Sequence, residues 1–235
     1  WFSSVLSTTS LVALMVALVS TTATTAWGQL PRTRLTSVTP PVGQVGVTVE
    51  VTVAGADIDE VGVMSFSHAG ITALQKTTES GGKKTPVANT FVVTIAKNVP
   101  AGLYDARVTG LFGASNPMTF AVTSREIVRE SEGNNGYDEA DEFALGKTVY
   151  GQINGAADVD YLKFTGKQGQ RVVVDCQATR VDSSLHAICE IYSRVDGRVR
   201  QLSFARRQVG HDPVTDVTLP ADGEYFVKIY DERFA

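Results

Sequence analysis

The sequence predicts an all-β chain: two tandem antiparallel β-sandwiches that follow an N-terminal signal segment. Runs rich in valine and threonine alternate apolar and polar residues with a period of two, as half-buried strands do. Clusters of glycine, asparagine, aspartate and proline separate these runs at short intervals. No stretch of useful length shows the helical period of 3.6 residues.

Residues 1–28 read as a signal peptide. An apolar run at Ser10–Ser20 is followed by small and hydroxyl residues up to Ala26-Trp27-Gly28, a small-x-small cleavage pattern. No charged residue precedes Arg32, and we attribute the missing basic region to a truncated start. A membrane anchor is the alternative, but a spanning helix needs about 18 or more consecutive apolar residues. We therefore expect an exported protein (periplasmic, cell-surface or extracellular) that meets a membrane only through this segment, if uncleaved.

Residues 35–123 carry the first set of strand signals. The clearest is V-T-V-E-V-T-V-A at Val47–Ala54. Others follow at 61–67, 71–76, 90–96, 104–110 and 118–123, separated by turn residues such as S-G-G-K-K. About seven short strands with this punctuation favour an immunoglobulin-like β-sandwich.

Residues 124–142 interrupt the strand pattern and read as an acidic linker. Strand signals return over 143–235, for example at 161–165, 171–178 and 224–230, and favour a second, jelly-roll-like β-sandwich. D-G pairs at 196–197 and 222–223 predict hairpins. The last strand pattern ends close to Ala235, so we expect this domain to be truncated at its C-terminus or to end at a fragment boundary.

Oxygen-rich side chains concentrate on both sides of the start of the second sandwich. They are Glu130, Glu132, Asn134, Asn135, Asp158 and Asp160. In extended backbone, residues i and i+2 point the same way, so each carboxylate pair can share one side. Calcium takes six to eight oxygen ligands with flexible geometry. If the linker folds back onto the D-x-D turn, four carboxylates converge and a calcium ion would relieve their repulsion. The alternative is a solvated acidic linker beside a surface turn.

Other candidate chemistry is weaker. Zinc prefers nitrogen and sulfur ligands, and each of the three histidines lacks a second ligand nearby in sequence. Asp182-Ser183-Ser184 and His186 could suggest a hydrolase, but no G-x-S-x-G elbow surrounds the serine and the segment reads as a turn. The net charge of −4 argues against a nucleic-acid partner. Cys176 and Cys189 lie in strand-like segments and either form a disulfide or remain buried free thiols.

The order of short motifs in the second half resembles the bacterial pre-peptidase C-terminal domain. E-x-E-x-N-N (130–135) is followed by G-x-I (151–153), D-x-D-Y (158–161), G-Q (169–170), D-S-x-L (182–185) and A-D-G-E-Y-x-V-x-I-x-D (221–231). The resemblance covers about Glu126 to the end. It implies a β-sandwich without catalytic residues, appended to secreted peptidases and other exported bacterial proteins. In related collagen-binding domains the acidic N-terminal segment and the D-x-D turn bind calcium, which implies the same ligand set here.

These observations predict a non-catalytic accessory or binding module of an exported bacterial protein, with a calcium-stabilised junction between its two sandwiches. Its expected partners are other domains of the same protein or an extracellular protein or polymer. The alternative is the non-catalytic portion of a secreted peptidase whose catalytic domain lies outside this chain. A structural stalk with no ligand is the third interpretation.

Overall fold

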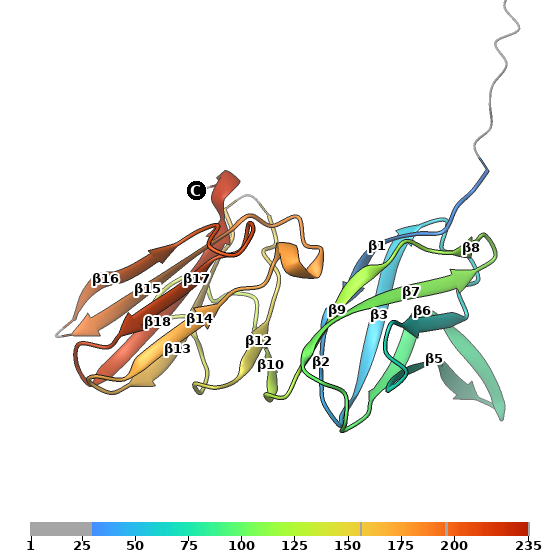
Figure 1. The fold of residues 1–235 in the computed structure, drawn as a ribbon, viewed down its shortest axis with the longest axis horizontal. Helices are drawn as coiled ribbons and strands as arrows, with labels where there is room; N and C mark the ends of the chain where they lie inside the picture. The colour runs from blue at the N-terminus through green and yellow to red at the C-terminus, as the bar shows by residue number, and fades with distance from the viewer. Residues whose placement is uncertain (1–29, 156, 196, 235) are drawn as a thin grey trace, which may run out of the picture. The chain divides into compact units, whose positions relative to one another are not determined.

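The computed structural model describes residues 30–155, 157–195 and 197–234, so the predicted signal segment lies outside the described residues. Within these ranges the chain is nearly all β, as the sequence predicts (Figure 1). The helical residues form two short 3-10 turns, Thr179–Val181 (η1) and Glu232–Phe234 (η2). No helix in the described part of the chain is long and apolar enough to cross a membrane.

Two sheets enclose the first hydrophobic core. The first sheet, in spatial order, contains β1 (Arg34–Thr39), β3 (Thr48–Ala56), β6 (Lys83–Ile95) and β5 (Ile71–Ser80). The second contains β2 (Val42–Gln44), β9 (Met118–Thr123), β7 (Gly102–Gly110) and β4 (Val63–Phe66), and β8 (Gly113–Ala114) pairs with β7. Phe91 from β6 and Phe120 from β9 are fully buried in this core. In β9 every second residue is buried, which is the alternation that the sequence predicts.

The S-G-G-K-K segment forms the tight turn of the long β5–β6 hairpin. Ser80 pairs with Lys83, so Gly81 and Gly82 are the two central residues. Their φ angles are +58° and +77°. This is the turn geometry that matches strand twist and that glycine adopts without strain.

The second core lies beneath a five-stranded sheet. This sheet contains, in order, β11 (Asp141–Glu142), β13 (Val159–Gly166), β18 (Gly223–Asp231), β15 (Ala187–Val195) and β16 (Arg198–Ala205). Two smaller sheets pair β14 (Arg171–Asp175) with β17 (Val214–Thr218) and β10 (Ile127–Arg129) with β12 (Thr148–Tyr150). Phe164 and Tyr225 stack in the core with ring centroids 5.5 Å apart.

The two predicted D-G hairpins have different outcomes. Val195 pairs with Arg198, so β15 and β16 pair as the predicted hairpin, although Asp196 itself lies outside the described residues. The hairpin at 222–223 is wrong, because that turn leads from β17 in the small sheet to β18 in the five-stranded sheet. A D-G turn fixes a local reversal of the chain, but the next strand pairs where its apolar face is buried.

The acidic segment 124–142 is packed on the second sandwich. β10 runs parallel to β12, and β11 runs parallel to β13. Two further backbone hydrogen bonds hold the part of the segment that connects β10 to β11. Glu130 N donates to Tyr150 O at 3.1 Å, and Tyr161 N donates to Asn134 O at 2.9 Å. The parallel pairings were not predicted, since sequence alternation does not report strand direction.

Candidate functional site

Glu130 and Asp160 bring the two predicted carboxylate pairs together. Glu130 follows β10, and Asp160 lies near the start of β13 on the face that also carries the core residue Leu162. The two carboxyl groups are in hydrogen-bond contact. Glu130 Oε1 also accepts a hydrogen bond from Gln152 N at 2.5 Å. A Cβ at Gly151 would overlap the Glu130 carboxylate, so a larger residue there would displace this side chain.

The electrostatics of this pair favour a neutral or cation-bound state. Asp160 is 5% exposed. Burial, followed by the charge of Glu130 and the hydrogen bond to it, raises the pKa of Asp160 to about 8. Asp158 and Glu132 add to the repulsion. Burial also raises the pKa of Glu130. Without a cation, therefore, the pair is stable when Asp160 keeps its proton and donates it to Glu130.

Asp158 and the asparagines occupy the adjoining turn. Asp158 accepts a hydrogen bond from Asn154 N. With its amide nitrogen turned toward Asp158, Asn135 donates to Asp158 Oδ1 at 3.0 Å and to Val159 O at 3.2 Å. In this orientation the Asn135 amide nitrogen is a donor, and its amide oxygen points away from Asp158. Asn134 is 1% exposed, and its side-chain nitrogen lacks a hydrogen-bond partner.

Glu132 and Asp141 lie at the margin of the carboxylate cluster. Glu132 is exposed in a turn, and its charge reaches both Glu130 and Asp160. Asp141, which was not predicted, accepts hydrogen bonds from Ser131 N at 2.5 Å and Ser131 Oγ at 2.6 Å. Its charge also acts on Glu130. Among residues 30–155, 157–195 and 197–234, no three or more His, Cys, Asp or Glu side chains are already arranged to hold a metal ion.

The donor set nevertheless fits a hard cation. It offers carboxylate oxygens, one pair of them on the nearly fully buried Asp160. Calcium prefers such oxygen ligands and accepts irregular geometry. Because Glu132 is exposed, its side chain can turn toward Asp160 without disturbing the core. These residues therefore suit calcium better than zinc.

The Asp182-Ser183-Ser184 segment is a turn. Asp182 has a φ of +60° and caps η1. Ser183 Oγ accepts a hydrogen bond from Leu185 N at 3.2 Å, and Ser183 N donates to Ala178 O at 3.0 Å. His186 stacks on His211 with ring centroids 5.5 Å apart. The hydroxyl and the imidazole are thus engaged in local packing, as the turn interpretation expects.

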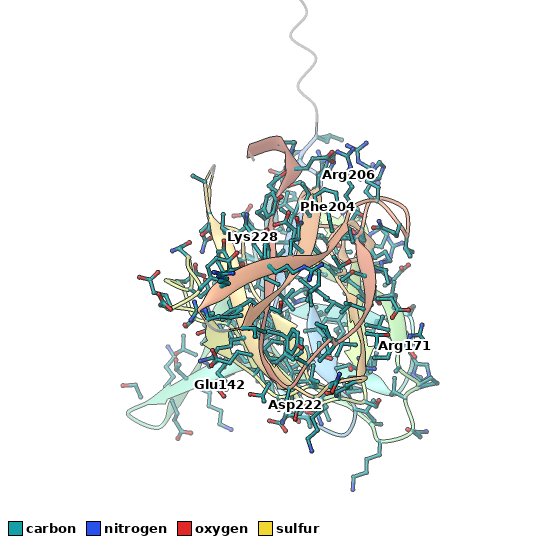
Figure 2. All side chains as sticks on the ribbon, turned by 90° about the vertical axis from the view of Figure 1, so that its left-hand side faces the viewer. Glu142, Arg171, Phe204, Arg206, Asp222 and Lys228 are labelled. Atoms are coloured by element: carbon teal, nitrogen blue, oxygen red, sulfur yellow. The ribbon has the colours of Figure 1, made fainter. Side chains whose placement is uncertain are left out.

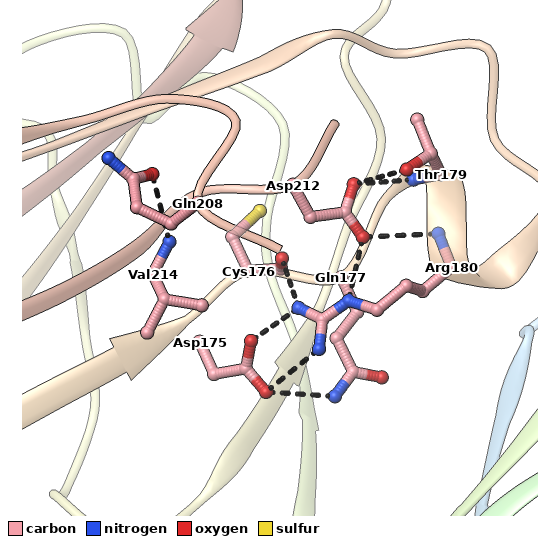
Figure 3. A network of polar contacts seen from close by, with 8 residues as sticks. All are labelled: Asp175, Cys176, Gln177, Thr179, Arg180, Gln208, Asp212 and Val214. Atoms are coloured by element: carbon pink, nitrogen blue, oxygen red, sulfur yellow. Dashed lines mark hydrogen bonds and ion pairs between the residues drawn. The ribbon is translucent and has the colours of Figure 1, made fainter. Parts of the chain in front are cut away.

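A buried ion pair anchors this part of the sandwich (Figure 3). Arg180 donates through Nε to Asp212 Oδ2 at 2.9 Å and through Nη2 to Cys176 O at 2.9 Å, and it also pairs with Asp175. Thr179 donates to Asp212 Oδ1 from its backbone nitrogen at 2.7 Å and its hydroxyl at 2.8 Å. Asp212 is 0% exposed. Burial alone would raise the pKa of Asp212, but the hydrogen bonds from Arg180 and Thr179 lower it.

Both cysteines are free thiols. Cys189 is fully buried in the second core, and Cys176 is partly buried beside the Arg180 ion pair. Burial raises the pKa of the Cys176 thiol to about 12 and also raises that of Cys189. Of the two possibilities that the sequence left open, the structure has the buried thiols.

An aromatic cluster on the outer face of the five-stranded sheet was not predicted. Tyr137, from the acidic segment, packs edge-on against Tyr161, Tyr192 and Phe226 with centroid distances of 4.8, 5.7 and 5.2 Å. Figure 2 labels Phe204, from the edge strand β16, and Lys228, from β18. In E-Y-F-V-K-I-Y, Phe226 and Tyr230 are four residues apart and therefore share one face of a strand, which the sequence alone indicates. Only strand pairing shows which of them meet.

Comparisons with known proteins give a partial match. No family model matches the chain. A "probable subtilase-type serine protease" of Deinococcus radiodurans is 34% identical over 102 residues, covering 40% of this chain and 14% of that protein. The match thus spans about one seventh of the relative's length.

Two solved structures share low similarity with the chain. One is the Bacteroides ovatus mixed-linkage glucan utilization locus protein SGBP-B in complex with a mixed-linkage heptasaccharide. It has a TM-score of 0.29 and 15% identity, covering 83% of this chain and 39% of that one. The other is gamma-CGTase from alkalophilic Bacillus clarkii, with a TM-score of 0.25 and 14% identity, covering 88% and 24%. Neither likeness is close enough to support an argument.

Proposed function

We propose that this chain is a non-catalytic accessory and binding module of an exported bacterial protein, in which calcium holds the acidic segment 124–142 against the second sandwich. The observation that carries the proposal is the contact between Glu130 and the nearly buried Asp160. The resemblance to the pre-peptidase C-terminal domain and the partial similarity to a subtilase-type protease support an accessory role.

The carboxylates would hold the ion from both sides of the contact. Glu130 and Glu132 belong to the acidic segment, whereas Asp160 belongs to β13, on which that segment packs, and Asp158 lies in the turn just before this strand. Calcium would supply positive charge at the place where these groups repel one another. Binding would therefore stabilise the docked acidic segment, while the apolar core of the sandwich remains unchanged.

Isothermal titration calorimetry tests the calcium site. The chain is titrated with calcium after treatment with chelator, and compared with a Glu132→Ala/Asp160→Ala variant. With free calcium of ~1 mM and a dissociation constant of ~10 μM, binding adds about 2.7 kcal/mol to stability. We also expect proteolysis within 124–142 to slow when calcium is present.

A Glu50→Ala/Glu79→Ala variant is the matched control, because it removes two exposed carboxylates from the first sandwich. It should bind calcium as the parent chain does. Absence of binding heat, together with a cleavage rate that calcium leaves unchanged, would refute the calcium site.

The second candidate function is the non-catalytic portion of a secreted peptidase. The partial match to the Deinococcus radiodurans protein favours it. The complete open reading frame separates the two candidates. Protease motifs beyond residue 235 would support the peptidase, whereas further β-modules or a surface anchor would support an adhesin or binding protein.

A further inference from the structure

The outer face of the five-stranded sheet presents its side chains in transverse rows. Cross-strand pairing puts one row in the order Tyr161, Lys228, Glu190 and Phe204. The next row is Lys163, Phe226, Tyr192 and Gln201. Alternate residues of each strand, such as Leu162 and Val227, point to the core instead. With strands about 4.8 Å apart, each row extends over roughly 14 Å.

Phe204 and Tyr230 contribute accessible aromatic surface to this face, whereas Phe226 is fully buried against Tyr137 and Arg194. Phe204 on the edge strand is 50% exposed, although phenylalanine is a residue that folding normally buries. Tyr230 is partly exposed, and Lys228 Nζ lies 4.4 Å from its ring centroid. Tyr137 and Tyr161 continue the aromatic area toward β13. The face therefore combines flat apolar surfaces with hydroxyl groups at their rims.

A preorganised polar cluster lies at the centre of the face. Glu190 accepts hydrogen bonds from Tyr192 Oη at 2.7 Å, Gln201 Nε2 at 3.1 Å and Tyr230 Oη at 3.4 Å. Lys228 Nζ is 3.6 Å from Glu190 Oε2. Burial first, and then Glu190, raise the pKa of Tyr192 and raise that of Tyr230 to about 12, so both hydroxyls remain protonated donors at neutral pH.

The charges of the face are balanced internally. Lys163 lies 3.7 Å from Glu224, and Arg194 lies 2.9 Å from Asp138 while its guanidinium stacks over Phe226 at 4.9 Å. Lys228 pairs with Glu190, as described above. A strongly charged ligand would have to break these pairs, whereas a neutral ligand would not.

We propose that this outer face, defined by the two rows and Tyr230, binds a neutral polysaccharide. A sugar ring offers a face of C–H groups, which packs on an aromatic ring, and hydroxyls that both donate and accept hydrogen bonds. Phe204 and Tyr230 provide the packing surfaces, and Gln201 and Lys228 provide polar groups beside them. The inference rests on the binding role proposed above and identifies the class of ligand.

A neutral peptide fits this face less well. Extended peptides gain much of their affinity by hydrogen bonding to the backbone of a sheet edge. The face of a sheet offers side chains only, because the backbone groups are used within the sheet. Here the partly exposed polar groups are tyrosine hydroxyls, the Gln201 amide and the Lys228 ammonium group, which match the many hydroxyls of a sugar.

Native affinity electrophoresis tests the proposal. The chain is run through gels that contain mixed-linkage β-glucan, xylan or soluble starch, and is mixed with insoluble cellulose and chitin in a pull-down. We expect retention on at least one of these polysaccharides, and we expect it to persist in chelator and in high salt. Replacement of one stacking aromatic should weaken binding roughly tenfold.

The test variants are Phe204→Ala and Gln201→Ala, which change exposed side chains on the edge strand. Val173→Ala is the control, since Val173 is 55% exposed on β14 in the smaller sheet of the same sandwich. Thermal unfolding checks that each variant is folded. Retention on none of the five polysaccharides, or retention that both face variants leave unchanged, would overturn the proposal. A column of immobilised proline-rich peptide tests the alternative ligand, and retention on this column alone would also overturn the proposal.

The calcium titration fails or succeeds independently of this test. If polysaccharide retention persists while calcium gives no binding heat, the metal site is wrong and the ligand face stands. If calcium binds and no polysaccharide is retained, the ligand face is wrong.

Discussion

The two sandwiches have the same kind of secondary structure but very different interiors. In the first, the buried polar residues are Thr33, Thr90 and Ser115, and none of the buried residues among those described is charged. In the second, the buried residues include Asp160, Glu190, Asp212 and Asp231. Burying a carboxylate costs free energy unless it is paired or protonated. The first interior is therefore explained by apolar packing, whereas the second contains groups that packing alone does not require.

The buried carboxylates of the second sandwich are stabilised in two opposite ways. The pKa of Asp212 is lowered by hydrogen bonds that act against the effect of burial, so this residue is stable as an anion. The pKa of Asp160 is raised by burial and by other carboxylates, so this residue is stable when protonated or next to a cation. This difference separates a structural ion pair from a candidate binding site.

Removal of one core ring tests whether the two interiors are independent. Phe120→Ala should cost the first sandwich about 3–5 kcal/mol, because it leaves a cavity in a closely packed core. Differential scanning calorimetry should show one unfolding transition moving to lower temperature while the second stays in place. Phe164→Ala is the matched change in the second core and should move the other transition. A single transition that both variants shift would show that the two cores unfold together.

Removal of the buried anion tests the ion pair. Asp212→Ala should destabilise the second sandwich by about 3–5 kcal/mol, because it leaves Arg180 without its buried partner. Urea denaturation at pH 7 measures this loss. Asp216→Ala removes the partner of Arg171 from an exposed ion pair and should cause little change. Equal effects of the two variants would contradict the assigned role of burial.

The pH dependence of stability distinguishes Asp160 from Asp212. The folded-state pKa of Asp160 is raised from 3.8 to about 8. Its contribution to the free energy of unfolding is therefore complete below about pH 4 and is lost as the pH rises through 8. The contribution of Asp212 has the opposite sign and is lost as the pH falls, because its pKa is lowered.

Asp160→Asn should remove this loss of stability at alkaline pH, because the asparagine amide can donate a hydrogen bond to Glu130 as the protonated acid does. In chelator at pH 8 we expect the variant to unfold about 4 °C higher than the parent chain, and the difference should shrink at pH 5. Melting curves between pH 4 and pH 9 measure this, with Glu79→Gln as the control. A difference that is constant with pH would show that the buried acid pair is not the cause.

Much of the site could be predicted from sequence, although its geometry could not. Carboxylates at i and i+2 indicated two pairs that could converge, and the structure brings Glu130 to Asp160. Strand pairing brings in Asp141, and the turn makes Asn135 a donor to Asp158. Both effects depend on how distant segments are placed, which local spacing does not specify.

By itself the sequence determined that this chain is β-structured, where most strands lie and where several turns occur, because alternation and turn chemistry act over a few residues. Tertiary structure alone decided which groups meet. Thr179 donates to Asp212, which lies 33 residues away in the sequence. Glu190 accepts hydrogen bonds from Tyr192 on its own strand and from Tyr230 on the neighbouring strand β18. Whether a buried carboxylate becomes an ion-pair partner, a protonated acid or an acceptor for tyrosine hydroxyls depends on burial and on neighbours that only the folded chain supplies.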